Sequence, residues 1–317
     1  MKKSENNMGD TEATNLSWAE RHGISNGWLA LLWVIAAFVL FQVFGGVIAV
    51  VLVVLKASNG SGTIDMQHIS TLIGQNMGLV FLSNSIGQIL FLALATWFFC
   101  RLQANADDRP AFLRLQFFDN TFAMMGLVFL LMLAVQPVIW LLGWLNSLIP
   151  FPQVLQSLQM QQMQKIKDYL GGHGHLWIVM VNVAIVPAFC EEILFRGYAL
   201  RSFQKSWGII TAIILSGVIF GIFHMEPSNF LPLASIGILL AFLTWVTRSI
   251  YPAMVAHFVN NGTSVLVGRF YPQTTFASTT VSTPPSPYLV VLSILISGFL
   301  LYLLFNNVMN PRRDISS

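Results

Sequence analysis

The sequence predicts an all-α integral membrane protein with about eight transmembrane helices. Of its 317 residues, 55% are hydrophobic and only 9% are charged, whereas about a quarter of the residues in an ordinary soluble domain are charged. Apolar runs of roughly 17 to 25 residues, long enough to cross the hydrocarbon core of a bilayer, recur along the chain. We expect spans near residues 27–55, 78–100, 121–149, 176–200, 207–225, 229–247, 252–268 and 287–309.

The polar stretches around these runs divide the chain into six segments. The opening stretch is too long and too acidic a lead for a secretory signal, so we expect the first span to be retained. The segments are a polar cytoplasmic N-terminal segment (1–26), the N-terminal transmembrane helices (27–150), an amphipathic or interfacial connector (151–175), an intramembrane core (176–268), a Ser/Thr/Pro loop (269–286), and the last transmembrane helix with a basic C-terminal tail (287–317).

The connector carries apolar residues at near-helical spacing among glutamines and two lysines. These apolar residues are Val154, Leu155, Leu158, Ile166 and Tyr169. The pattern predicts a helix that lies in the membrane interface. A solvated loop helix and a lateral gate are the alternative interpretations.

The lysines and arginines predict how the chain is oriented in a plasma or inner cell membrane. With eight spans and the N-terminus inside, eleven of them fall on the cytoplasmic side and four outside, in line with the positive-inside rule. The cytoplasmic ones are Lys2, Lys3, Arg21, Arg101, Arg109, Arg114, Arg201, Lys205, Arg248, Arg312 and Arg313, and the outer ones are Lys56, Lys165, Lys167 and Arg269. This bias places both termini in the cytoplasm and accounts for the net charge of +3. Because no basic face is clustered, the expected partner is the lipid bilayer and not a nucleic acid.

The fourth expected span contains three ionisable residues inside an apolar run, namely Glu191, Glu192 and Arg196. A charged side chain near the bilayer centre costs roughly 2.5 to 3.5 kcal/mol, so such residues usually line a water-filled cavity and mark function. Glu192 and Arg196 are spaced i,i+4 and can pair along one helical face, while Glu191 projects about 100° away from Glu192. We therefore predict a structural Glu192–Arg196 pair that leaves Glu191 as the free carboxylate.

Two later spans carry the remaining groups of a hydrolytic site. His224 ends the fifth span, and His257 and Asn261 share one face of the seventh because they are spaced i,i+4. Hydrolysis needs a carboxylate that takes a proton from water, imidazoles that hold that water or a metal, and an amide that donates to the oxyanion. Glu191, His224, His257 and Asn261 form such a set, and the first three are also possible metal ligands.

Each of these residues also has a purely structural interpretation. A single intramembrane His or Asn is often a hydrogen-bonding contact between helices, and the Glu192–Arg196 pair could serve folding alone. His173 and His175 lie in a glycine loop that suggests a metal site, but no further ligand accompanies them.

The depths expected for the site residues disagree. At 1.5 Å per residue, Glu191 falls near mid-membrane and His224 towards the outer end of its span, a mismatch on the order of 10 Å. Tilted or interrupted helices would repair this mismatch, and nearby prolines favour such breaks. These prolines are Pro187, Pro227, Pro232 and Pro252.

Three ordered motifs carry a resemblance to a known family. They are Glu191-Glu192-x-x-x-Arg196, Phe220-x-x-x-His224 and His257-x-x-x-Asn261, supported by Phe195-Arg196-Gly197 and by the run from Thr247 to Pro252. In this order on hydrophobic helices, they resemble the CAAX protease and bacteriocin-processing (CPBP, abortive-infection type) family of intramembrane proteases. The short interval between the second and third motifs is similar to the bacterial branch. The resemblance covers about residues 176–268, which would be the intramembrane protease core.

The resemblance implies an intramembrane endopeptidase that hydrolyses a membrane-associated protein or peptide, as a CAAX prenyl endopeptidase does. Glu191 would activate the hydrolytic water, and Glu192 with Arg196 would orient it. Two other functions fit the same charges. One is a proton- or ion-coupled transporter, and the other is a non-catalytic membrane scaffold or immunity protein.

The ligand set decides what we expect of a metal. By the resemblance, His224 and His257 would bind the water or a metal, and Asn261 would stabilise the oxyanion. A catalytic zinc usually has three protein ligands and a water. Because taking Glu191 as the third ligand would remove the free base, we expect a metal-free site, with a weakly held divalent ion such as zinc as the alternative.

Overall fold

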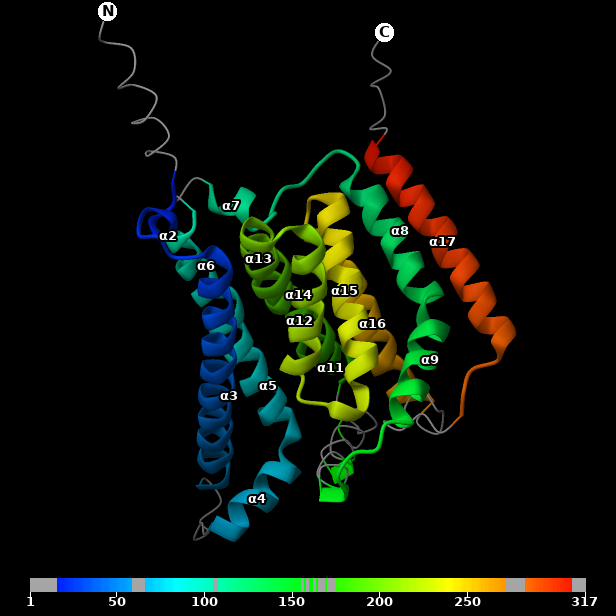
Figure 1. Ribbon diagram of the computed structural model, residues 1–317. Helices are drawn as coiled ribbons and strands as arrows, with labels where there is room; N and C mark the ends of the chain where they lie inside the picture. Colours follow the sequence, from blue (N-terminus) through cyan, green and yellow to red (C-terminus); the bar gives the residue numbers. More distant parts are fainter. Residues whose placement is uncertain are drawn as a thin grey trace, which may run out of the picture.

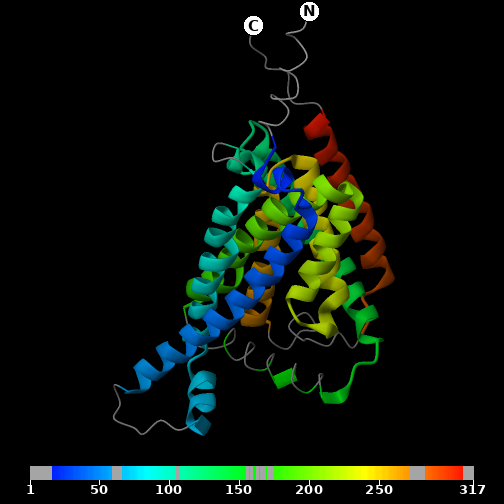
Figure 2. The same cartoon turned by 60° about the vertical axis from the view of Figure 1, so that its left-hand side comes forward.

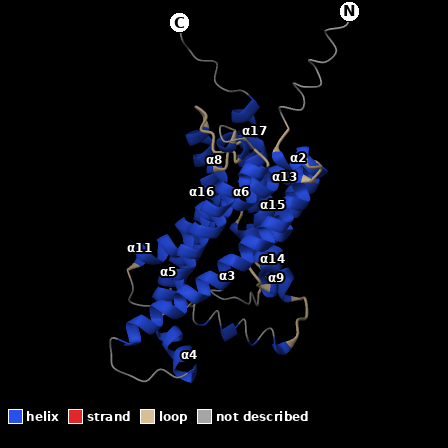
Figure 3. Cartoon of the chain, turned by 90° about the vertical axis from the view of Figure 1, so that its left-hand side faces the viewer, coloured by secondary structure: helices blue, strands red, loops and turns tan. Residues whose placement is uncertain are grey.

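The computed structural model of the protein describes residues 16–58, 66–104, 108–154, 175–271 and 283–309, with single positions between 155 and 174. Every regular element in these residues is a helix, which confirms the all-α prediction (Figure 1 and Figure 3). The predicted interfacial helix of the connector, except at single positions, and most of the Ser/Thr/Pro loop lie outside the described residues, as does His173.

The first half of the described chain contains ten helical elements, of which η1 is π-helical and η2 is a 3₁₀ turn. They are α2 (Trp18–Arg21), α3 (Asn26–Ser58), α4 (Met66–Gln75), α5 (Met77–Gly87), η1 (Gln88–Leu94), α6 (Ala95–Phe99), η2 (Cys100–Leu102), α7 (Arg109–Phe112), α8 (Thr121–Ala134) and α9 (Gln136–Ser147).

The second half contains two π-helical segments, η3 and η4, and a 3₁₀ turn, η5. Its elements are α11 (Leu176–Met180), η3 (Val181–Ile185), α12 (Val186–Glu192), η4 (Ile193–Ala199), α13 (Leu200–Trp207), α14 (Ile209–Phe223), η5 (Pro227–Asn229), α15 (Phe230–Thr247), α16 (Tyr251–Phe270) and α17 (Pro287–Met309). The elements α11 to α13 follow one another without a break and make one long helix.

Five helical stretches of the described chain are long and apolar enough to cross a membrane. They are Asn26–Ala57, Met77–Leu102, Leu176–Trp207, Pro227–Thr247 and Pro287–Val308. The bent pair of α8 and α9 gives a sixth if it is counted as one span. This composition makes the chain a multi-pass membrane protein.

The third expected span, over residues 121–149, is not one straight helix. It is bent by 45° between α8 and α9. Pro137 lies in the first turn of α9, where its ring cannot fit against a preceding helical carbonyl. The side chain of Gln136 donates to the Met132 carbonyl at 3.0 Å and supplies a partner at the break.

Helices α14 and α16 occupy the two remaining positions at which we expected spans. With 15 residues, α14 is about 22 Å long, which is shorter than the roughly 30 Å hydrocarbon core. The 20 residues of α16 include His257, Asn260, Asn261 and Arg269, and these polar side chains lower its apolar character.

The long helix from α11 to α13 lies at the centre of the bundle. In the most apolar window of each span, 61% of the residues are buried for this helix, against 22% for the first and last spans. Figure 1 shows α3 and α5 on one side of it and α8, α9 and α17 on the other, and the turned view in Figure 2 agrees. Buried side chains form one cluster between α3, η1 and the elements α12 to α14, and a second between α8, α15, α16 and α17. The charged residues of α12 and η4 are therefore enclosed by helices and do not face lipid.

Candidate active site

The two glutamates lie on α12, a seven-residue segment between the π-helical segments η3 and η4. Glu191 is 6% exposed and Glu192 is fully buried. Single π-helical turns inside α-helices are rare and are often found at functional sites. Two buried carboxylates in the most enclosed helix therefore need either charged partners or a chemical role.

Glu192 and Arg196 form the ion pair that the sequence predicts. Arg196 Nη1 donates to Glu192 Oε1 at 2.9 Å, and both side chains are fully buried. Arg196 Nη2 donates to the backbone carbonyl of Gly237 on α15 at 3.1 Å, and the guanidinium lies 4.3 Å from the centroid of the Phe220 ring on α14. The pair thus joins the central helix to two neighbouring helices.

A close contact between two glycines brings α15 within reach of Arg196. A Cβ atom built on Gly237 would lie 2.8 Å from both the Cα and the carbonyl oxygen of Gly217 on α14. Small residues at such crossings let the backbones of membrane helices approach closely. The sequence does not reveal Gly237 as a site residue, because the acceptor that it supplies is a backbone carbonyl.

Glu192 also binds His257, a contact that sequence reasoning missed. The Nδ1 atom of His257 lies 2.8 Å from Glu192 Oε1, and the imidazole is almost fully buried. Because an ionised carboxylate only accepts hydrogen bonds, Nδ1 carries the proton and donates it. In the neutral imidazole, Nε2 then has a free lone pair.

His224 is held in the same tautomer by a different partner. Its Nδ1 atom donates to the Phe220 carbonyl at 2.8 Å, one turn earlier on α14. The Nε2 atoms of His224 and His257 each lie 4.0 Å from the same oxygen, Oε2 of Glu191. The structure therefore brings Glu191 and both histidines together around one point, as the sequence predicts.

The expected depth mismatch of about 10 Å between Glu191 and His224 is wrong. We placed the end of the fourth span at residue 200, but the helix continues through α13 to Trp207. The chain then reverses at Gly208, which has a φ of +79° that side-chain-bearing residues rarely adopt. Glu191 lies 17 residues before Gly208 and His224 lies 16 residues after it, so the two antiparallel helices bring them to the same level.

Glu191 Oε2 is the atom that both histidines face. It is buried and has no hydrogen-bond partner in the part of the chain that the structure describes. The side chain of His224 is 26% exposed, whereas that of His257 is 3% exposed. The least enclosed side of this group is therefore the one that His224 forms.

The two 4.0 Å gaps suit a water molecule better than a tetrahedral zinc ion. A water with hydrogen bonds of about 2.8 Å would span such a gap at an angle of about 90°, close to the angle between its O–H bonds. A tetrahedral zinc ion with bonds of about 2.1 Å would hold its ligand atoms roughly 3.4 Å apart. The described residues contain no group of three His, Cys, Asp or Glu side chains arranged to hold a metal.

Asn261 and His175 make contacts of another kind. One N–H of the Asn261 amide donates to the Val183 carbonyl of η3 at 3.1 Å, and its Oδ1 accepts from Asn260 at 3.2 Å. The bond to Val183 joins α16 to η3, and the bond from Asn260 lies within α16. His175 lies at the N-terminal end of α11, where it is exposed and stacks on Trp177.

Comparison with known proteins gives one family match. Residues 173–263 match the family model described as type II CAAX prenyl endopeptidase, Rce1-like. No curated protein and no solved structure matches the chain. The matched stretch contains Glu191, His224 and His257, together with Glu192 and Arg196. Residues 173–263 are therefore a domain of the Rce1-like type II CAAX prenyl endopeptidase (CPBP) family.

Proposed function

We propose that this protein is an intramembrane endopeptidase that hydrolyses a membrane-associated protein or peptide, with its catalytic residues in the core 176–268. The observation that carries the proposal is the geometry of Glu191. Its Oε2 atom is buried, lacks a hydrogen-bond partner among the described residues and faces the Nε2 atoms of His224 and His257. A carboxylate in this setting is suited to take a proton from water.

In the proposed reaction, Glu191 is the general base and His224 positions the nucleophile. A water donates one hydrogen bond to Glu191 Oε2 and the other to His224 Nε2. As the water oxygen attacks the peptide carbonyl, its proton moves to Glu191. Glu191 then gives this proton to the nitrogen of the leaving amine, and the C–N bond breaks. The products are a new carboxyl terminus and a new amino terminus.

The oxyanion of the tetrahedral intermediate needs hydrogen-bond donors on the opposite side of the site. We assign Nε2 of His257 to this role, as a donor in the imidazolium form of the ring, because Glu192 holds the ring at Nδ1. Arg196 acts through Glu192 and is a positioning residue. One N–H of Asn261 is taken by Val183, which leaves its second N–H as the further donor that we assign to the oxyanion.

The donor types at the site also fit a divalent ion such as zinc, held by His224, His257 and Glu191. Such an ion would polarise the peptide carbonyl and lower the pKa of a bound water. The 4.0 Å gaps favour the metal-free arrangement, because a tetrahedral ion would need the three side chains to move together by a few tenths of an ångström.

The proposed topology has eight spans, with α14 and α16 as the fifth and seventh. Both run beside α15 in the bundle (Figure 1). We propose that the end carrying α2, α7 and α13 is cytoplasmic in a cell membrane, because it bears Arg21, Arg109 and Arg201. Lys56 and Arg269 lie in the last turns of α3 and α16, at the opposite end.

The proposal is tested by incubating the purified protein in mixed micelles with reporter peptides, each made with and without a prenyl group. We expect the wild type to cleave a subset of them and Glu191→Ala to cleave none. Asp119→Ala is the matched control, because it removes an exposed carboxylate outside the core and should cleave as the wild type does. Equal cleavage by wild type and Glu191→Ala would refute the proposed base.

A further inference from the structure

Two arginines at the end of the bundle that carries α2, α7 and α13 share one neutral acceptor. Arg114, in the loop after α7, donates from Nη2 to Gln204 Oε1 at 2.8 Å. Arg201, on α13, donates from Nη1 to the same oxygen at 3.5 Å. Two like charges are thus held next to each other around an uncharged side chain.

Neither arginine has its hydrogen-bonding capacity satisfied within the described residues. Nη1 of Arg114 and Nε of Arg201 are buried there without a hydrogen-bond partner. Arg114 as a whole is only 7% exposed. Neither arginine forms an ion pair within the part of the chain that the structure describes. A buried guanidinium without a carboxylate is costly, so the arrangement calls for an anion.

Arg114 has both an unfavourable side-chain environment and an unfavourable backbone conformation. Burial, together with the charge of Arg201, lowers the pKa of Arg114 to about 10. Its backbone has a φ of +55°, which residues with side chains rarely adopt, and the Ile250 N–H fixes it by donating to the Arg114 carbonyl at 3.1 Å. The backbone at Arg114 is thus held by a contact with the residue that precedes α16.

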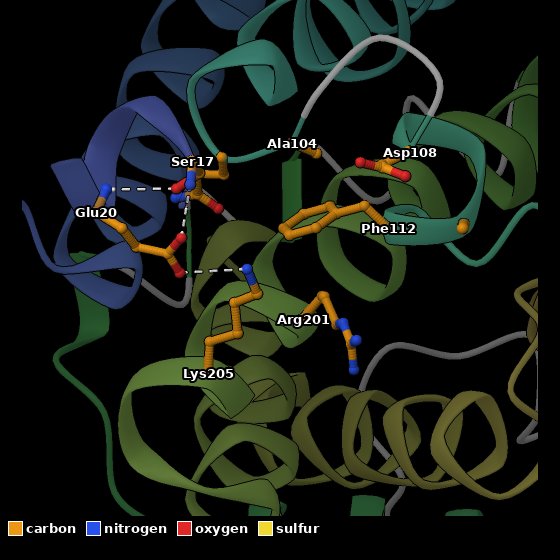
Figure 4. A pocket seen from close by; sticks show the side chains of 9 residues that line it. Ser17, Glu20, Ala104, Asp108, Phe112, Arg201 and Lys205 are labelled. Carbon is orange, nitrogen blue, oxygen red and sulfur yellow. Dashed lines mark hydrogen bonds and ion pairs between the residues drawn. The ribbon is translucent and has the colours of Figure 1, made fainter. Parts of the chain in front are cut away.

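A polar cavity lies beside this cluster and reaches it at Arg201, while Arg114 and Gln204 do not line it. It has a volume of about 240 Å³ and is lined by Arg201, Lys205, Phe112, Glu20 and Asp108, among others. Figure 4 shows that the Arg201 guanidinium and the Asp108 carboxylate lie on opposite sides of the Phe112 ring in this view. Glu20 is already bound to Lys205 at 3.3 Å. The lining therefore leaves Arg201 and Asp108 as the charged side chains without an ion pair among the described residues.

We propose that Arg114 and Arg201 form a binding site for a phosphate group, separate from the catalytic core. The planar guanidinium fork matches phosphate oxygens and can donate two parallel hydrogen bonds to them. The phosphate belongs either to the headgroup of an anionic lipid or to a soluble phosphate. Bound there, it neutralises the two charges and joins the loop after α7 to α13.

The test measures thermal unfolding of the full-length protein with two probes. In neutral detergent, inorganic phosphate is compared with chloride at equal ionic strength. In nanodiscs, phosphatidylcholine alone is compared with an equal mixture of phosphatidylcholine and phosphatidic acid. We expect the wild type to melt at a higher temperature with phosphate, which identifies a soluble ligand, or with phosphatidic acid only, which identifies a lipid headgroup. No shift in either arm would overturn the proposal.

Two variants and a control separate the site from general charge effects. Arg201→Gln should bind the effective probe roughly tenfold more weakly or worse, because it loses charge-assisted hydrogen bonds. Gln204→Glu keeps both arginines but places a carboxylate between them, so it should melt higher without ligand and lose the response to the probe. Arg101→Gln removes an exposed charge and should respond as the wild type does. A wild-type response in Gln204→Glu and Arg201→Gln would also overturn the site.

Discussion

Removing the Arg196 side chain should cost a large part of the stability of the protein. In Arg196→Ala, Glu192 would stay fully buried without the guanidinium that lies 2.9 Å from its carboxylate in the wild type. Leaving one charge of a buried pair uncompensated costs roughly 3 to 5 kcal/mol. The carbonyl of Gly237 would also lose its donor, which adds about 1 kcal/mol. We therefore expect Arg196→Ala to lower the free energy of unfolding by at least about 3 kcal/mol.

A double-mutant cycle separates the pair from other effects of these substitutions. Glu192→Ala should cost a similar amount, because it leaves Arg196 unpaired and removes the acceptor of His257 Nδ1. The double variant Glu192→Ala/Arg196→Ala should be milder than the sum of the two by roughly 1 to 3 kcal/mol. The assay is SDS titration of the purified protein in mixed micelles, followed by tryptophan fluorescence. Strictly additive single effects would refute the coupling, and the exposed pair Arg101→Ala with Asp119→Ala serves as the additive control.

Three further predictions address topology, pH and metal. In a cysteine-free background, single cysteines at Ser61 and Ser282 should react with an impermeant maleimide in intact cells, and labelling of one at Asp108 would contradict the eight-span topology. Although burial opposes its ionisation, hydrogen bonds from Ser17 and Asn26 and the charge of Lys205 hold the pKa of Glu20 at about 2. Its stabilising effect is therefore present above pH 4.5, and the stability difference between wild type and Glu20→Gln should shrink as the pH falls towards about 2. Active protein should hold no stoichiometric zinc by elemental analysis; zinc that is lost in His224→Ala and restores chelated wild type would refute the metal-free site.

Contacts within one helix could be predicted from the sequence. Between helices, the grouping of Glu191, His224 and His257 could be predicted, but not their hydrogen-bond partners. The Glu192–Arg196 pair follows from i,i+4 spacing alone, and the structure has it at 2.9 Å. The bond between Glu192 and His257 joins residues that are 65 positions apart, so it depends on how α12 and α16 pack. The tautomer of His257 depends on that packing in the same way, whereas the Phe220 carbonyl fixes that of His224 within the end of one helix.

Hydropathy located the apolar runs but not the ends or bends of the helices. The apolar run ends near residue 200, whereas the helix continues to Trp207. Hydropathy misses this extension because α13 has a polar face with Arg201 and Lys205. Missing this extension produced the wrong depth for Glu191 relative to His224. The bend before α9 is different, since Pro137 stands inside the expected span and is a visible helix breaker.

The central claim is that Glu191 activates water and that its role is chemical and not structural. The most direct test measures cleavage and unfolding in the same preparations of wild type, Glu191→Gln and the control Asp119→Asn. Because Glu191 Oε2 has no hydrogen-bond partner among the described residues, the amide should leave the free energy of unfolding within about 1 kcal/mol of the wild type. Cleavage should fall by roughly 10² to 10⁴, the usual contribution of a general base, and Asp119→Asn should change neither quantity. Glu191→Gln that is as stable as the wild type and cleaves at the wild-type rate would contradict the account.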